Sequence, residues 1–245
     1  MVFLIRQRIK LLGVTTLFAL LVFTLTIHDF LAISRPVDGN VLVVEAWILS
    51  SPAIREAMEE FERGHYEWLV TVGGPIGEDG ESAGQENSAE LAARELRELG
   101  VDANRVIVLP IVNVTRHRTY ASALALKSWL RRSNIETTGV NVFTRGVHAR
   151  KSLVLFRRAL GPGTHVGVIA GTENTYDPDY WWISIRGIHM VLRKTIGYLY
   201  AEFWPLPESL PPFSSSGDSS SSRPSQPTDH RQLTEDLGAY LALPN

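Results

Sequence analysis

The segment from Thr144 to Arg150 combines residue types that bind anions with a position where a strand pattern gives way to a helix pattern. It follows an apolar run at Val140–Phe143, and its polar side chains include Thr144, Arg145, His148 and Arg150. Because a helical pattern begins directly after it, the first free backbone N–H groups of that helix are expected at the same place. Positive charge and free N–H groups together predict an anionic ligand, of which phosphate is the best match.

Other expected strands end in residues that could belong to the same site. Glu45 follows an apolar run, where an unpaired carboxylate would be costly to bury. Pairing with Arg118 or Arg150 is a structural explanation for Glu45, and a functional carboxylate held by the same arginine is the alternative. Gly73 and Gly74 follow the second apolar run, and glycines there allow a ligand to approach the backbone closely.

These residue types predict a phosphate-binding arrangement. Arg118, Arg150 and the helix N-terminus at Val147–His148 would hold the phosphate group. Thr119 and Thr144 would donate hydrogen bonds to it. The sequence offers no metal-ligand spacing and no cofactor motif, and the positive charge predicts a phosphorylated small molecule as the partner.

His148 and Glu45 are the candidates for acid and base if a reaction takes place. The positive end of a helix disfavours the cationic form of a histidine, so a neutral His148 imidazole is expected. A neutral imidazole suits proton transfer or a hydrogen bond to a phosphate ester. Simple packing of His148 at the helix N-terminus is the alternative, and the residues alone leave open whether any reaction is catalysed.

Strand and helix patterns alternate through the middle of the chain, as is typical of an α/β domain. The expected strands are Val41–Glu45, Trp68–Val72, Arg105–Leu109, Val140–Thr144 and His165–Ala170. The expected helices are Pro52–Arg63, Glu86–Leu99, Thr119–Arg132, Ala149–Leu160 and a closing segment from Trp181 to Phe203. This order predicts a Rossmann-like, doubly wound, mostly parallel five-stranded sheet, whose carboxyl-terminal edge brings the polar residues together.

The N-terminus predicts one transmembrane helix before this domain. Leu11–Ile27 has no charged residue and as a helix spans ~25 Å, and the apolar patch up to Ile33 extends it to membrane thickness. The basic residues before it, Arg6, Arg8 and Lys10, predict a cytoplasmic N-terminus and a main domain outside the inner membrane. A signal peptide cleaved near Ala32 and a buried helix of a soluble protein are the two alternatives.

The chain is therefore expected to have three parts. Residues 1–35 form the basic stub and the anchor in the inner membrane, through residues 11–33, and residues 36–207 form the α/β domain. Residues 208–245 are rich in serine and proline and are expected to be disordered, with a short apolar C-terminus. A docking peptide is the alternative for that C-terminus.

Composition excludes several classes of function. The chain has no cysteine, which excludes disulfide frameworks, thiolate metal sites and cysteine nucleophiles. A formal net charge of −2 argues against a general nucleic-acid binder. No G-x-G-x-x-G or Walker lysine motif follows a strand, which argues against dinucleotide and P-loop sites. Gly80–Gly84 matches the nucleophile-elbow pattern around Ser82, but its distance from the preceding strand indicates a chance match.

The order of these features resembles the YdcF–SanA–ElyC group of bacterial envelope proteins, which share a domain of unknown function. The resemblance covers roughly residues 40 to 201. It rests on the apolar first strand, Gly73-Gly74, Glu90 early in the next helix, Gly100-Val101, the threonine-centred segment Arg118–Ala123, and Thr144, His148 and Arg150. The chain departs from the family pattern at Glu45-Ala46-Trp47, where a glycine-rich turn is common, and at Arg118 and Ser122, where asparagines are common.

The resemblance implies a Rossmann-like domain that is often tethered by one membrane helix, with a role in envelope integrity, peptidoglycan assembly or polyprenyl-phosphate metabolism. We therefore expect a membrane-anchored envelope protein that binds a phosphorylated, lipid-linked ligand at the carboxyl-terminal edge of its sheet. The alternative is a non-catalytic envelope scaffold or regulator, whose closing helix and C-terminal peptide recruit envelope proteins. A serine hydrolase that uses Ser82 is a third option.

Overall fold

A computed structural model of the chain describes residues 2–46, 51–76, 87–112, 114, 116–133 and 135–205. Its α-helices are α1 (Val2–Leu31), α2 (Ser51–Arg63), α3 (Ser88–Glu98), α4 (Arg118–Ser133), α5 (Ala149–Leu160) and α6 (Ile185–Phe203). Its strands are β1 (Val41–Glu45), β2 (Trp68–Gly73), β3 (Val106–Pro110), β4 (Val140–Arg145) and β5 (Val166–Gly171). Three short 3₁₀ helices are η1 (Ala103–Arg105), η2 (Gly146–His148) and η3 (Pro178–Ile183). All the described residues belong to one unit, residues 1–213.

The five strands form one parallel sheet in the order β3-β2-β1-β4-β5. The chain builds outward from β1 to β3, then returns to the other side of β1 for β4 and β5, which is the doubly wound arrangement of a Rossmann-like fold. The predicted fold class is therefore confirmed. The strands are buried on both faces, which explains why they read as continuous apolar runs in the sequence.

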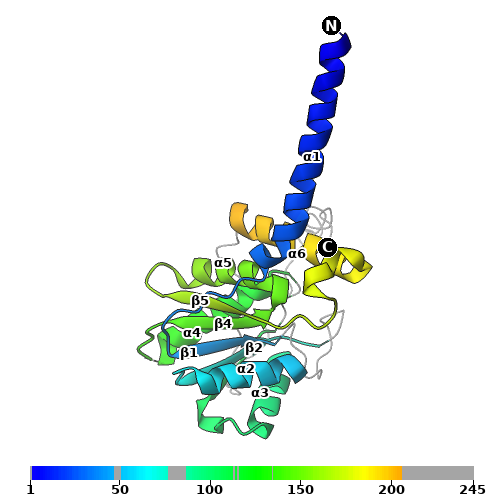
Figure 1. Cartoon of the computed structure of the whole chain (residues 1–245). Helices are drawn as coiled ribbons and strands as arrows, with labels where there is room; N and C mark the ends of the chain where they lie inside the picture. The colour runs from blue at the N-terminus through cyan, green and yellow to red at the C-terminus, as the bar shows by residue number, and fades with distance from the viewer. Residues whose placement is uncertain are drawn as a thin grey trace, which may run out of the picture. The chain divides into compact units, whose positions relative to one another are not determined.

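Helices cover both faces of the sheet (Figure 1). Alternate residues of β1 point to opposite faces, because side chains alternate along a strand. Leu42 and Val44 pack with residues of α2 and α3, whereas Val41 and Val43 pack with residues of α4 and α5. These two apolar layers fix the height of each strand relative to its neighbours, and so fix which residues meet at the carboxyl-terminal edge.

The closing segment differs from its prediction. The sequence predicted helical spacing from Trp181 to Phe203, but the chain forms η3 and α6 with a break at Ser184. The Ser184 side chain accepts a hydrogen bond from the backbone N–H of Gly187, which makes Ser184 the N-cap of α6. Helix α6 packs against α5 and η2 outside the sheet's helical layer, and this contact brings α6 to the carboxyl-terminal edge.

The end of α1 packs against this outer layer. Ile27 and Leu31 belong to an apolar cluster with Val147, Trp181 and Val191. The part of α1 that precedes it is exposed nearly all round, and Ile5–Leu31 is long and apolar enough to cross a membrane. The helix rises away from the sheet, and α6 runs across its foot (Figure 1).

The linker after α1 is bonded to the sheet. The backbone N–H of Arg35 donates to Val168 O and the N–H of Val168 donates to Arg35 O, with N–O distances of 2.8 and 3.1 Å. The Asn141 side chain on β4 both accepts from Val37 N and donates to Val37 O, each at 2.8 Å. The domain boundary predicted after residue 35 therefore falls within a segment in which Arg35 and Val37 are both hydrogen-bonded to the sheet.

Candidate functional site

The sheet places a ring of polar residues at the topological switch point between β1 and β4. Glu45 is the last residue of β1, and Thr144 and Arg145 are the last residues of β4. The two strands are neighbours, with Val44 of β1 in register with Phe143 of β4, so their ends meet. In doubly wound sheets this is the place where ligands bind, since the connections leave β1 and β4 in opposite directions.

Glu45 is almost completely buried at this point, with 1% of its surface exposed. The Ser152 hydroxyl on α5 donates a hydrogen bond to Glu45 Oε2. Burial raises the pKa of the Glu45 carboxyl, while Ser152, Thr144, Lys194 and Lys151 act in the opposite direction more weakly. Glu45 is therefore a carboxyl group that takes up a proton more readily than an exposed one.

His148 links two elements in a chain of polar contacts beside Glu45. Its Nε2 lies 3.2 Å from Thr119 Oγ1 at the start of α4, and its Nδ1 lies 2.9 Å from Lys194 Nζ on α6. Burial lowers the pKa of His148 well below its usual value, and the positive charges of Lys194, Lys151 and Arg193 lower it further. The sequence also predicted that the pKa of His148 is lowered. The cause is burial and the nearby cations, rather than the positive end of a helix.

Two lysines next to Glu45 and His148 have unusual electrostatics. Burial lowers the pKa of Lys194 to about 7, with Lys151 and Arg193 adding to the shift and Glu45 and Glu173 opposing it. Burial also lowers the pKa of Lys151, which Glu45 partly offsets. Both amines would hold their protons more tightly if an anion lay beside them, because opposite charge favours the protonated form.

One buried hydroxyl at this place lacks a hydrogen bond in normal geometry. Among the described residues, Thr144 Oγ1 and Arg145 Nε are buried and make no such bond. Arg145 shares a face of the sheet with Phe143, on the side of α2 and α3, because side chains alternate along a strand, so only Thr144 lies beside Glu45. The Thr144 hydroxyl lies close enough to Glu45 to lower its pKa, but not in normal hydrogen-bond geometry. An unpaired buried donor costs about 1–3 kcal/mol, so the Thr144 hydroxyl is a candidate donor to an acceptor at this site.

The side of the cluster near α4 and α6 includes a histidine in a rare backbone conformation. His117 has φ of 53°, which is uncommon for a residue other than glycine, and its ring stacks on Tyr200 of α6 at 5.9 Å. Burial lowers the His117 pKa, and Lys151 and Arg116 lower it further. Cations and histidines thus gather on this side, where α4, α5 and α6 converge.

The glycines predicted to admit a ligand admit a helix instead. A Cβ on Gly73 would lie 2.3 Å from Ser88 Oγ and 2.8 Å from Ala89 N, both at the start of α3. Gly74 exchanges hydrogen bonds with Ser88: its N–H donates to Ser88 Oγ, and its carbonyl accepts from Ser88 N and Oγ. The close approach inferred from Gly73 and Gly74 therefore serves the packing of α3 on β2.

The two predicted arginines do not join Glu45 in the way expected. Arg150 Nε donates to Phe30 O, and its guanidinium lies 3.7 Å from the centre of the Phe30 ring, on the side of α5 that faces α1. Arg118 is exposed at the first residue of α4, next to Thr119, which does reach His148. The structure thus unites Glu45, Thr119, Thr144 and His148 of the predicted site but leaves Arg150 outside it.

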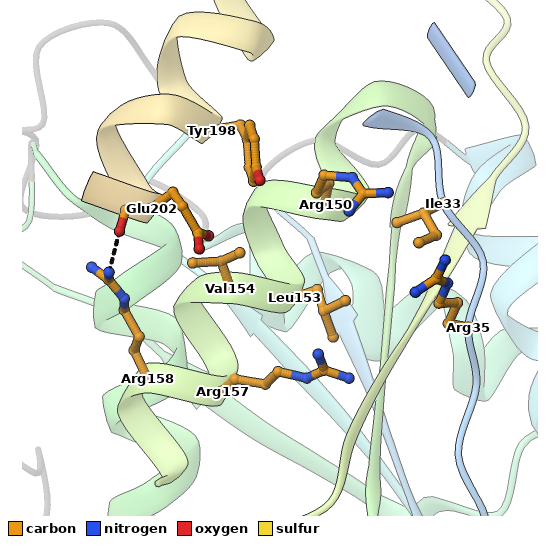
Figure 2. A pocket seen from close by; sticks show the side chains of 9 residues that line it. All are labelled: Ile33, Arg35, Arg150, Leu153, Val154, Arg157, Arg158, Tyr198 and Glu202. Carbon is orange, nitrogen blue, oxygen red and sulfur yellow. Dashed lines mark hydrogen bonds between the residues drawn. The ribbon is translucent and has the colours of Figure 1, made fainter. Parts of the chain in front are cut away.

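Arg150 lines a separate pocket of about 350 Å³ between α5, α6 and the linker after α1 (Figure 2). Its walls are formed by Ile33, Arg35, Arg150, Leu153, Val154, Arg157, Arg158, Tyr198 and Glu202. We call it the arginine pocket. Arg157 donates to Val166 O, and Arg158 donates to Glu202 O and Trp204 O. These guanidinium groups are used to join elements of the fold.

Sequence reasoning missed Lys151, Ser152 and Lys194. Lys151 and Ser152 follow Arg150 directly, and each step along a helix turns the side chain by about 100°, so neighbours in sequence face different surroundings. Lys194 lies in α6, which follows the alternating strands and helices, so that pattern does not predict where α6 packs. A signal for Lys194 was nonetheless present, because it lies on the face of α6 opposite the apolar positions Leu192 and Ile196.

Loops after β1, β2 and β3 contain residues 47–50, 77–86, 113 and 115, which lie outside the described residues. Ser82, the candidate nucleophile, is one of these residues. The C-terminal stretch from residue 206 also lies outside the described residues. Within the described residues, no group of three or more histidines and acidic residues could hold a metal ion. The described cluster can bind an anion and exchange protons through His148, Lys194 and Glu45.

Comparisons with protein-family models, with curated proteins and with solved structures found no match to this chain.

Proposed function

We propose that the chain is a membrane-anchored envelope protein whose switch-point cluster binds the phosphate group of a lipid-linked ligand. The cluster is defined as Glu45, Thr119, Thr144, His148, Lys151, Ser152 and Lys194. In this proposal α1 is the anchor in the inner membrane, its N-terminus is cytoplasmic, and the α/β domain lies on the other side. The resemblance to the YdcF–SanA–ElyC group supports the setting, and the cluster supports the ligand class.

The observation that carries the proposal is the coincidence of a buried hydroxyl that makes no hydrogen bond in normal geometry and a lysine whose pKa is lowered. Thr144 Oγ1 is that hydroxyl, burial lowers the pKa of Lys194 to about 7, and both residues act on the Glu45 carboxyl. A bound phosphate would satisfy the hydroxyl and restore the favoured charge of the amine in one step. A purely structural cluster would gain nothing from leaving these groups unsatisfied, because each of them lowers the stability of the fold.

Proton transfer in the cluster has a defined path if the bound phosphate reacts. Lys194 Nζ contacts His148 Nδ1, and His148 Nε2 contacts Thr119 Oγ1, so a proton can pass between the ammonium and the hydroxyl through the imidazole. Burial raises the pKa of the Glu45 carboxyl, so Glu45 exchanges a proton more readily than an exposed carboxyl would. Binding is the proposed function, and this path is what a phosphoryl or ester reaction would use.

The test is thermal unfolding of the full chain in detergent micelles with inorganic phosphate, farnesyl phosphate, a nucleotide sugar and uncharged farnesol. A ligand at ~100 times its Kd adds about 2.7 kcal/mol, which raises Tm by several degrees. We expect phosphorylated compounds, but not farnesol, to raise Tm. The rise should be largest for farnesyl phosphate if the ligand is lipid-linked.

Thr144→Val and Thr71→Val are matched variants for this test. Both threonines are buried on strands, but Thr71 Oγ1 donates to Ile107 O at 3.4 Å whereas Thr144 Oγ1 has no partner. We expect Thr144→Val to reduce the rise without lowering the unliganded Tm, and Thr71→Val to keep the rise in full. No rise with any phosphorylated compound would overturn the proposal and favour the scaffold alternative.

A further inference from the structure

Helix α6 has an apolar face on its exposed side as well as on its buried side. Gly187, Val191 and Ala201 are buried against the domain. The exposed side contains Ile185, Ile188, Leu192, Ile196, Leu199 and Phe203. These follow the spacing i, i+3, i+7, i+11, i+14 and i+18, which places them in one stripe along the whole helix. A water-facing helix normally shows polar residues along that side, so the stripe indicates a covered surface.

The stripe continues into the preceding 3₁₀ helix and past the end of α6. Ile183 is 74% exposed and Tyr180 56% exposed in η3, and Trp204 is 60% exposed directly after α6. Tryptophan and tyrosine are enriched where a protein meets the interface between lipid and water. Together, η3, α6 and Trp204 form a surface with isoleucine, leucine and phenylalanine along its length and aromatic residues at both ends, which we call the α6 face.

The end of α1 sets the height of the α6 face. Trp181 Nε1 donates to Thr24 O at 3.2 Å, and Thr24 belongs to the apolar segment of α1 that is long enough to cross a membrane. Phe30 of α1 contacts Tyr198 of α6, with ring centres 5.4 Å apart. If α1 spans the bilayer, its last apolar turns enter the lipid at the level of η3 and α6, and α6 runs across that level (Figure 1).

The flanks of the α6 face agree with this position. Arg186, His189 and Arg193 are exposed beside the apolar stripe. Basic residues next to an apolar stripe are typical of helices that lie in the interface plane, where the apolar side enters the acyl region and the cations contact lipid phosphates. Lys194 points the other way, toward His148 in the switch-point cluster.

We propose that the α6 face is a membrane-binding surface that lies in the outer interface of the bilayer that α1 crosses. The occupant is lipid, because the face begins at the depth where α1 leaves the apolar layer and adjoins α1 directly. This inference rests on the proposed anchoring by α1. It adds a consequence for the ligand: α6 then lies between the bilayer and the switch-point cluster, so a lipid-linked phosphate would reach Lys194 from the membrane side.

A depth measurement on the full chain tests this, and the absence of cysteine makes single-site labelling simple. Leu192→Cys and Ile196→Cys, each with an environment-sensitive fluorophore, are reconstituted in phosphatidylcholine and phosphatidylglycerol vesicles that contain lipids with a quencher high on the acyl chain. Glu98→Cys on the exposed side of α3 is the control that should remain in water, and Leu17→Cys on α1 reports the anchor.

We expect strong quenching at Leu192 and Ile196, comparable to that at Leu17, and none at Glu98. Quenching at Leu17 with none at Leu192 and Ile196 would overturn the α6 proposal while leaving the anchor in place. Shielding of Leu192 and Ile196 from an aqueous quencher without lipid quenching would mean that a second copy of the chain covers the face, which also overturns it. Absence of quenching at Leu17 would overturn the anchor and the α6 proposal together.

Discussion

The switch-point cluster and the arginine pocket both contain cations within a short distance, but they differ in what those cations contact. In the arginine pocket, Arg150, Arg157 and Arg158 donate to backbone carbonyls of Phe30, Val166, Glu202 and Trp204. In the switch-point cluster, Lys194 contacts His148 Nδ1, and the buried Thr144 hydroxyl makes no hydrogen bond in normal geometry. The cations of the arginine pocket donate to carbonyls, whereas the cation nearest to His148 in the cluster contacts an imidazole.

This difference separates two uses of positive charge. Arginine keeps its charge when partly buried and can satisfy several carbonyls at once, so it joins elements at little electrostatic cost. Lysine loses its proton readily when buried, so a lysine kept beside another lysine lowers stability unless an anion comes to it. A cluster of cations in a sequence therefore indicates a binding site where the fold buries lysines whose pKa is lowered, rather than arginines that donate to backbone carbonyls.

The largest expected effect is on anion affinity. Lys194→Met removes the cation nearest to His148, and we expect the affinity for farnesyl phosphate to fall by roughly 100-fold, since a charged hydrogen bond contributes about 1.5–3 kcal/mol. Arg150→Met, the matched change in the arginine pocket, should alter it by less than about twofold. Isothermal titration of the full chain in micelles measures both. A larger loss in Arg150→Met would return the phosphate to the site first expected from the sequence.

The next effect is the pH dependence of that affinity. The pKa of Lys194 is lowered to about 7 in the free protein and should rise when an anion binds, so protons are taken up on binding. Affinity should fall as pH rises above about 7, by at most tenfold per unit. The profile of Lys194→Met should be flatter. An unchanged affinity between pH 6.5 and pH 9 would show that Lys194 does not contact the ligand.

A smaller effect concerns stability, where the two regions should respond with opposite sign. The lowered pKa of Lys194 means that its charge disfavours the folded state, and wild-type stability should rise with pH from about 7 toward the usual lysine pKa. Lys194→Met should therefore raise Tm at pH 6. Arg157→Met should lower stability by about 1 kcal/mol, because Val166 O loses its donor. Scanning calorimetry at pH 6 and 9 compares them, and a lower Tm for Lys194→Met would mark the cluster as structural.

The smallest effect belongs to Glu45. Its carboxylate raises the pKa of both Lys194 and Lys151, so Glu45→Gln should lower the Lys194 pKa further and move the affinity profile toward acid. A movement of a few tenths of a pH unit is expected, because the effect of Glu45 is secondary to burial. Repeating the pH titration with this variant checks it. A movement toward alkaline pH would contradict the proximity of Glu45 to the lysines.

Much of the fold was predictable, because the spacing of apolar residues in the sequence reflects which positions are buried. The strands on either side of the switch point, Val41–Glu45 and Val140–Arg145, are buried on both faces and read as apolar runs. Before the closing segment, the helix boundaries differ by at most two residues from those expected, as at α3, where Asn87 is the N-cap and accepts from Ala89 N. Glu45 and Thr144 could be placed together because both follow strands of one sheet.

The rest of the site depends on contacts that periodicity does not contain. Lys194 reaches His148 only because α6 folds back over η2, outside the repeating strand and helix pattern. Arg150 and Lys151 are neighbours in sequence, but one faces α1 and the other faces the cluster. The sequence predicted that another group approaches the backbone closely at Gly73. It did not reveal whether that group is a ligand or the start of α3.

The bonds between the linker and β5 have a consequence for how a substrate would be found. Residues 32–40 connect α1 to β1, and among them Arg35 and Val37 are hydrogen-bonded to Val168 and Asn141. A flexible spacer would let a tethered domain search a volume that grows with its length. The described residues between α1 and β1 form no such spacer, so a membrane-bound molecule would have to arrive by lateral diffusion, which makes the encounter a search in two dimensions.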